Sequence, residues 1–84
     1  MERDDLNLTY PCRWDYHVIG EDEQTLRIAV AGVVGNVEYV LSLANRSKRG
    51  RYLSMHLTVV VQDEEHRLRL FEELREHADV RYVL

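Results

Sequence analysis

The chain has 84 residues, of which 45% are hydrophobic and 31% are charged. This length suits one domain with a small core, and this composition is too apolar for a disordered chain. The formal net charge of −4 argues against nucleic-acid binding, because the neutralisation of phosphates drives that affinity. Cys12 is the only cysteine, which excludes an internal disulfide and a multi-thiolate metal site within one chain.

The sequence gives no sign of a membrane or secretory segment. It has no apolar run of the length that a membrane helix needs, about 20 residues, and the opening MERDDLN is acidic and polar. We therefore expect a cytoplasmic protein without a membrane partner. Residues 1–9 are expected to form a flexible N-terminal tail, and residues 10–84 a single domain.

Alternation of apolar and polar residues predicts the strands. In residues 13–19 every second side chain, beginning at Trp14, is apolar. Residues 37–62 contain two further alternating segments joined by a polar, glycine-containing turn, which is typical of a β-hairpin. Each of these segments has one apolar face and one mixed face, and alternation places Arg46 on the same mixed face as Ser42. Residues 80–84 form a short last strand.

Helical spacing predicts two helices. The first begins at the acidic residues 21–23 and ends at Gly35-Asn36. Its buried face consists of Leu26, Ala29, Val30, Val33 and Val34. Gly32 lies inside this helix, and we expect a close approach to the sheet to explain it. Asp63 is a well-placed N-cap for the second helix.

The second helix carries one apolar stripe. The stripe is predicted to contain Leu68, Leu70, Phe71, Leu74 and Ala78. His66 and His77 lie on this helix without a partner at metal-ligand spacing, and we expect them to face solvent.

The order of these elements is β-α-β-β-α-β. It predicts an α+β fold of the ferredoxin-like βαββαβ type, with a four-stranded antiparallel sheet and two helices on one face. Right-handed crossovers place the first and third strands in the middle of the sheet. The other face of the sheet stays open.

The open face is the first candidate interaction surface. By alternation it carries Asp15, His17, Ser42, Ser54, His56 and Thr58, together with Val40 and Ala44. A mixed surface of this kind suits a partner, above all a second copy of the chain, or a small ligand. The alternative is a plain solvated face.

Chemistry at this face is not expected. His17 and His56 lie on adjacent strands, but zinc normally takes at least a third protein ligand and strand neighbours rarely converge. We therefore predict no metal site and no cofactor. Cys12 follows a proline, without a helix N-terminus to lower its pKa, and is expected to be a packed, half-buried thiol. The acidic residues fall at helix caps and ion-pair positions. We expect a protein that is not an enzyme.

The hairpin turn is the second candidate site. It gathers Arg46, Ser47, Lys48, Arg49 and Arg51, which together could hold a phosphate or a carboxylate. The alternative is a solvated tip whose charges prevent strand edges from sticking. No Walker or dinucleotide spacing accompanies the turn.

RNA recognition motifs share this topology, and residues 49–56 begin like their third-strand signature. That signature needs aromatic residues where this chain has Leu53 and His56, so we do not expect nucleic-acid binding.

The chain resembles the YbeD-like family of small uncharacterised bacterial proteins. The resemblance lies in Tyr10-Pro11-Cys12, in residues 16–20, in the turn at residues 47–52 and in Val80-Arg81-Tyr82-Val83-Leu84. It implies a ferredoxin-like fold similar to ACT regulatory domains, and a lipoic-acid-binding regulatory role. His17 stands where members of the family often have lysine, so a lysine contact to a carboxylate does not carry over.

These observations lead to one functional hypothesis and one alternative. The hypothesis is a non-enzymatic regulatory or ligand-sensing module, in a homodimer, that binds a small carboxylate such as lipoate. The alternative is a protein-interaction adaptor that presents its open face or an edge strand to a protein partner.

Overall fold

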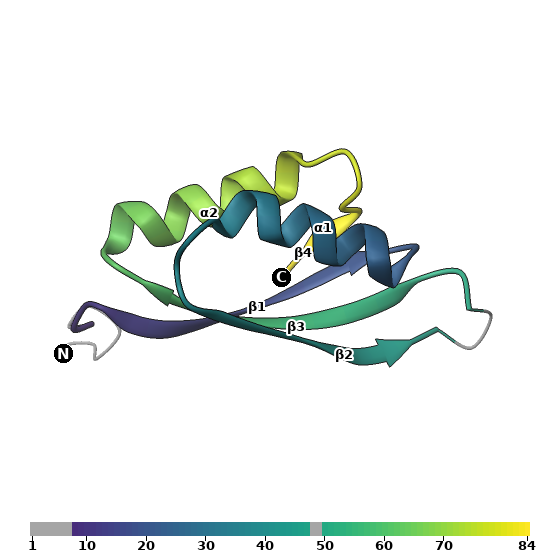
Figure 1. Ribbon diagram of the computed structural model, residues 1–84, viewed down its shortest axis with the longest axis horizontal. Coiled ribbons are helices and arrows are strands. Elements are labelled where there is room, and N and C mark those ends of the chain that lie inside the picture. Colours follow the sequence, from purple (N-terminus) through teal and green to yellow (C-terminus); the bar gives the residue numbers. More distant parts are fainter. Residues whose placement is uncertain (1–7, 48–49) are drawn as a thin grey trace, which may run out of the picture.

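The computed structural model in Figure 1 describes residues 8–47 and 50–84. Its elements are β1 (Cys12–Gly20), α1 (Glu23–Val34), β2 (Tyr39–Arg46), β3 (Leu53–Val61), α2 (Glu64–Glu76) and β4 (Tyr82–Val83). The sheet has the order β2-β3-β1-β4 with antiparallel neighbours, and both helices lie against one face of it (Figure 1). The predicted ferredoxin-like fold is therefore confirmed, as is the central position of the first and third strands. Most of the predicted tail, residues 1–7, lies outside the described residues.

The core forms between the covered face of the sheet and the two helices. β3 shows the alternation most fully, because its residues from Leu53 to Val61 are alternately buried and partly exposed. The buried apolar residues are Tyr16, Val18, Leu26, Ala29, Val30, Val34, Leu53, Met55, Leu57, Val59, Val61, Leu70, Leu74, Val80 and Val83. The prediction of a half-buried Cys12 is confirmed, since it packs against this core.

The caps of α1 follow the sequence signals. Asp22 is the N-cap, and its side chain accepts hydrogen bonds from the backbone N–H of Thr25 at 2.8 Å and from the Thr25 hydroxyl at 2.9 Å. These bonds hold the pKa of Asp22 below its usual value. Gly35 ends the helix with a φ of 73°, a left-handed conformation that favours glycine.

The end of β2 departs from simple alternation. The pairing register shifts between Leu43 and Asn45, so that Asn45 stands opposite Ser54 and Arg46 stands opposite the buried Leu53. Such an extra residue in one strand is a β-bulge. It turns Arg46 to the helix side, where its guanidinium lies 3.3 Å from Glu23 Oε1. The predicted position of Arg46 beside Ser42 on the open face is wrong.

The buried stripe of α2 also differs from the prediction. It consists of His66, Leu70 and Leu74, whereas Leu68 is 50% exposed. Ala78 lies beyond the end of the helix and is exposed. His66 faces inward because its Nδ1 accepts the backbone N–H of Gln62 at 2.9 Å, at the junction of β3 and α2. The predictions for Leu68, Ala78 and a solvated His66 are wrong.

Aromatic and cationic side chains attach the start of β1 to α2. The Tyr16 hydroxyl donates to the Arg67 carbonyl oxygen at 2.6 Å, and burial raises the pKa of Tyr16 to about 12. The Arg67 guanidinium lies 4.4 Å from the centre of the Trp14 ring, a cation–π contact, and donates to the Tyr10 hydroxyl at 3.1 Å.

Two glycines show opposite constraints. Gly32 is exposed, and a Cβ there would meet nothing within 4 Å, so the expected close approach to the sheet is wrong. Gly20 is buried at the end of β1, where a Cβ would lie 2.7 Å from Leu26 Cδ2 and 3.1 Å from the Asp79 carbonyl oxygen. Only Gly20 is required by packing.

Alanine substitutions at these two glycines should therefore shift stability in opposite directions. We expect Gly20→Ala to lower the free energy of unfolding by about 1–3 kcal/mol through overpacking. We expect Gly32→Ala to raise it by about 1 kcal/mol through helix propensity. Urea unfolding followed by circular dichroism measures both. Destabilisation by Gly32→Ala, or a neutral Gly20→Ala, would contradict this packing.

Candidate functional site

The centre of the open face is formed by polar side chains of β1 and β3. The strand register pairs His17 with His56 and Asp15 with Thr58. The two imidazole rings stack, with centroids 5.0 Å apart and planes inclined by 10°. Ser42 of β2 stands opposite His56 on the outer side. The structure thus brings together residues that are far apart in the sequence.

Asp15 is the acceptor at this centre. The Thr58 hydroxyl donates to Asp15 Oδ1 at 2.8 Å, and His56 Nε2 lies 3.1 Å from the same oxygen. These hydrogen bonds, the one from Thr58 above all, hold the pKa of Asp15 below its usual value. The carboxylate is therefore ionised at neutral pH, and it orients the His56 ring.

The cluster consists of hydrogen-bonding and aromatic side chains on the open face. Among residues 8–47 and 50–84, no three side chains of the ligating types are placed to hold a metal ion. Ser42 is exposed and Ser54 is partly exposed, and neither makes a side-chain hydrogen bond to another described residue. The arrangement offers hydrogen bonds and a stacked aromatic surface to a binding partner.

Apolar side chains surround this polar centre. Tyr82 pairs with Ile19, and Leu84 exchanges both backbone hydrogen bonds with His17, which places both side chains on the open face. Val40 pairs with Thr58 from β2. These three side chains are 65%, 74% and 58% exposed, respectively.

The hairpin turn closes through Ser47 and Tyr52. The Ser47 N–H donates to the Tyr52 carbonyl oxygen at 2.8 Å, and the Tyr52 N–H donates to Ser47 Oγ at 3.2 Å. The Arg51 guanidinium lies 5.7 Å from the centre of the Tyr52 ring. Lys48 and Arg49, which were predicted as anion ligands, lie outside the described residues.

A small hollow opens at the base of this turn. It has a volume of about 210 Å³ and is lined by Ile19, Asn45, Arg46, Ser47, Tyr52, Leu53 and Ser54. We call it the hairpin hollow. Of the predicted anion ligands, Arg46 and Ser47 line it. Ile19, Asn45, Tyr52 and Leu53 were not predicted as site residues; Ile19 reaches the turn only through the pairing of β1 with β3, and the β2 bulge sets Asn45 opposite Ser54.

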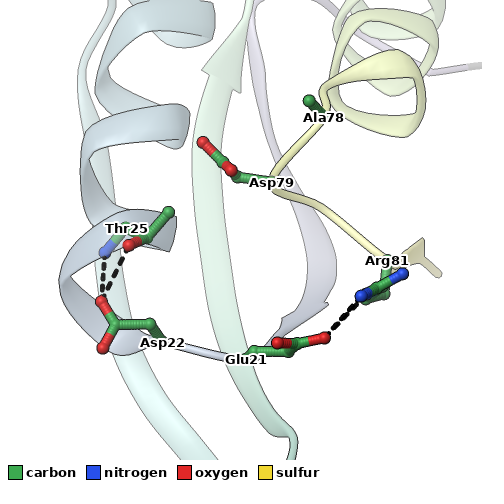
Figure 2. A pocket seen from close by; sticks show the side chains of 6 residues that line it. All are labelled: Glu21, Asp22, Thr25, Ala78, Asp79 and Arg81. Carbon is green, nitrogen blue, oxygen red and sulfur yellow. Dashed lines mark hydrogen bonds and ion pairs between the residues drawn. The ribbon is translucent and has the colours of Figure 1, made fainter.

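A second cavity lies beyond the end of β1, beside the start of α1. It has a volume of about 240 Å³ and is lined by Glu21, Asp22, Thr25, Ala78, Asp79 and Arg81. Figure 2 shows Arg81 directed at Glu21, Asp22 directed at Thr25, and Asp79 pointing toward α1. Three carboxylates therefore share this cavity with one guanidinium. Their charge disfavours an anionic ligand here.

The fold defines the structural class: a small ferredoxin-like domain with an ACT-like fold. The ACT domain from GTP pyrophosphokinase of Chlorobium tepidum aligns with a TM-score of 0.60 at 18% identity, covering 86% of this chain and 94% of that one. This likeness concerns the fold. No helix among the described residues has the length and apolar character needed to cross a membrane.

The family follows from the sequence. Residues 5–84 match the family described as "Protein of unknown function (DUF493)", and the chain belongs to it. The predicted resemblance to the YbeD-like family is thereby confirmed.

Relatives agree with this assignment. The uncharacterized protein Cj0253 of Campylobacter jejuni is 34% identical over 77 residues, which cover 92% of this chain and 86% of the relative. The UPF0250 protein of Hahella chejuensis is 33% identical over 81 residues, covering 92% and 89%, respectively. The solution structure of protein HP0495 from Helicobacter pylori aligns with a TM-score of 0.76 at 26% identity, covering 100% of this chain and 96% of that one.

Removal of the Thr58 hydroxyl should alter the titration of Asp15. We expect Thr58→Val to raise the pKa of Asp15 toward its usual value, as measured by NMR pH titration of the carboxyl carbon. Because the folded-state pKa is lowered, ionised Asp15 stabilises the fold above the usual aspartate pKa. That contribution is lost as the pH falls through the lowered value. The variant should therefore lose less stability on acidification.

Ser42→Ala is the matched control, because it removes a hydroxyl from the same face without a contact to Asp15. An unchanged Asp15 pKa in Thr58→Val would show that this hydrogen bond does not form in solution.

Proposed function

We propose that the protein is a non-enzymatic regulatory module that senses a small carboxylate with an apolar body, such as lipoate, in the hairpin hollow. The observation that carries the proposal is the composition of this hollow. Its lining is mainly apolar, with Ile19 and Leu53, and it includes Arg46 and Ser47, residues that carry a guanidinium and a hydroxyl. That combination matches a ligand with a charged head and an apolar chain.

The polar side chains at the hollow have hydrogen-bond donors available for a ligand. Arg46 has one ion pair among the described residues, to Glu23, and a guanidinium carries five N–H donors. Ser47 Oγ accepts the Tyr52 N–H, so its own proton remains available for donation. Arginine beside a hydroxyl is a favourable environment for a carboxylate.

The apolar side chains and the volume of the hollow limit the size of the ligand and favour an apolar chain. Leu53 is buried and Ile19 is half-buried, and each methylene that a ligand places against them contributes about 0.8 kcal/mol. Pockets for drug-sized ligands measure about 300–1,000 Å³, and the hollow is smaller. A short chain fits better than a large ring system. The cavity of Figure 2 is the wrong site for this ligand, because Glu21, Asp22 and Asp79 repel a carboxylate.

Two substitutions should change carboxylate binding in opposite directions. We expect Arg46→Gln to weaken lipoate binding and Glu23→Gln to strengthen it, since Glu23 competes with the ligand for the guanidinium. Titration followed by NMR chemical shifts measures the affinity. A ligand at 100 times its dissociation constant should also stabilise the protein by about 2.7 kcal/mol.

Lipoamide, a neutral analogue with the same apolar ring and chain, is the control ligand. Its affinity should not respond to either substitution. Equal responses for lipoate and lipoamide, or no binding of any short carboxylate, would refute the proposed ligand class.

A second candidate function is a protein-interaction adaptor, and the exposed Val40, Tyr82 and Leu84 around the polar centre of the open face favour it. Cross-linked pull-down should then capture a stoichiometric protein partner that Val40→Arg abolishes. Ile28→Arg is the matched control, because Ile28 is 65% exposed on α1, away from the open face. Equal capture by both variants would argue against this function.

A further inference from the structure

One half of β1 has a free edge. β3 pairs with β1 along its whole length, from Cys12 to Gly20. β4 pairs only with Val18 and Ile19, and its continuation at Leu84 reaches His17. Figure 1 accordingly shows the C-terminus ending beside the middle of β1. The first half of the strand therefore has no neighbour on this side among the described residues.

The backbone groups along this edge can be identified from the hydrogen bonds. His17 exchanges bonds with Leu84, and the Ile19 carbonyl oxygen accepts the Arg81 N–H, so the odd-numbered residues of β1 point toward β4. By the alternation of an antiparallel strand, the N–H and C=O groups of Arg13 and Asp15 point the same way. These groups have no backbone partner among residues 8–47 and 50–84. Such an edge is a template for another strand.

Charge selects one way in which two copies could pair there. In a two-fold antiparallel pairing, Arg13 can face Arg13, Asp15 can face Asp15, or Arg13 can face Asp15. The first two registers set like charges opposite each other, which is destabilising. The third sets Arg13 of each copy opposite Asp15 of the other, twice. Both side chains lie exposed on the open face.

The same register is compatible with the residues at the two ends of the free edge. It places Cys12 of one copy opposite Tyr16 of the other, so the added strand stops one residue before His17, where Leu84 already pairs. The chain bends at Pro11, directly before β1 begins, and so leaves that position free. Thr58 and His56 both contact Oδ1 of Asp15, which leaves Oδ2 for a guanidinium.

The helix side offers further contact. Trp14 would face Trp14 of the second copy at the two-fold axis, beneath Arg67. On α2, Arg67, Leu68 and Phe71 share one flank at helical spacing, and Leu68 is 50% exposed. An exposed leucine on that flank is a suitable contact for a neighbouring helix.

We infer that a second copy of this chain docks on the free edge of β1 through antiparallel β1–β1 pairing, with Arg13 of each copy opposite Asp15 of the other. The partner is thus a copy of the chain, and the surface is a strand edge rather than the open face. The inference does not depend on the proposed carboxylate site, which lies at the other end of β1.

A charge-exchange experiment tests this register. The native protein should have about twice the mass of the 10.0 kDa chain in sedimentation equilibrium. Arg13→Asp sets Asp opposite Asp, and Asp15→Arg sets Arg opposite Arg, so each variant alone should dimerise about tenfold more weakly or worse. An equimolar mixture of the two variants restores both opposite-charge pairs and should form a heterodimer of native affinity.

Arg69→Asp is the matched control for Arg13→Asp, because it makes the same change in net charge at an exposed position of α2. It should leave dimerisation intact. Circular dichroism verifies that each variant is folded. Asp15→Arg also removes the carboxylate that accepts from Thr58 and lies beside His56. If that variant fails to fold, the comparison of dimerisation between Arg13→Asp and Arg69→Asp tests the inference by itself. A monomeric native protein, or a dimer that Arg13→Asp leaves intact, would overturn the inference.

Discussion

The structure depends on the register between β1 and β3. Their nine pairs run from Cys12 opposite Val61 to Gly20 opposite Leu53. This register sends Tyr16 and Leu57 into the core while the neighbouring pair, His17 and His56, faces outward. Because successive side chains alternate between faces, a slip of one residue in β1 would turn one imidazole and one carboxylate, those of His17 and Asp15, into an apolar core. The register that buries the core therefore also places the stacked histidines and the Asp15 cluster on the other face.

The sequence predicts the fold because its local signals agree with one another. Asp22 and Asp63 accept N–H groups at the starts of the two helices, and Gly35 ends the first. The stripe of α2 was harder to predict, because Leu68 and Leu70 fit helical periodicity about equally well. The structure selects Leu70, since the adjoining position in the stripe holds His66, whose Nδ1 satisfies the Gln62 N–H. That contact joins two elements, so no periodicity within α2 could reveal it.

The candidate site was predictable only in part, and for a similar reason. Alternation correctly places the polar side chains of β1 and β3, because that pairing has no irregularity. In β2, however, the bulge between Leu43 and Asn45 reverses the face of Arg46, and bulges leave no reliable mark in a single sequence. The hairpin hollow is lined by Asn45, which the bulge sets opposite Ser54, and by Ile19 from a strand that is distant in the chain. A basic turn alone indicates charge, but it does not indicate the apolar side chains beside it.

The contacts of Arg46 would give the proposed carboxylate sensor a physical means of signalling. Glu23 lies between two guanidinium groups, at 3.3 Å from Arg46 and 2.9 Å from Arg27, and Arg27 also donates to the Leu41 carbonyl oxygen of β2 at 3.4 Å. This network connects the first turn of α1 to the edge strand. Under the proposed function, a carboxylate in the hairpin hollow would compete with Glu23 for Arg46 and leave Glu23 paired with Arg27 alone. A ligand changes an equilibrium only through contacts that differ between two states. In the proposed sensor the contact that would differ is the attachment of α1 to β2, at the opposite end of β1 from the free edge at Arg13.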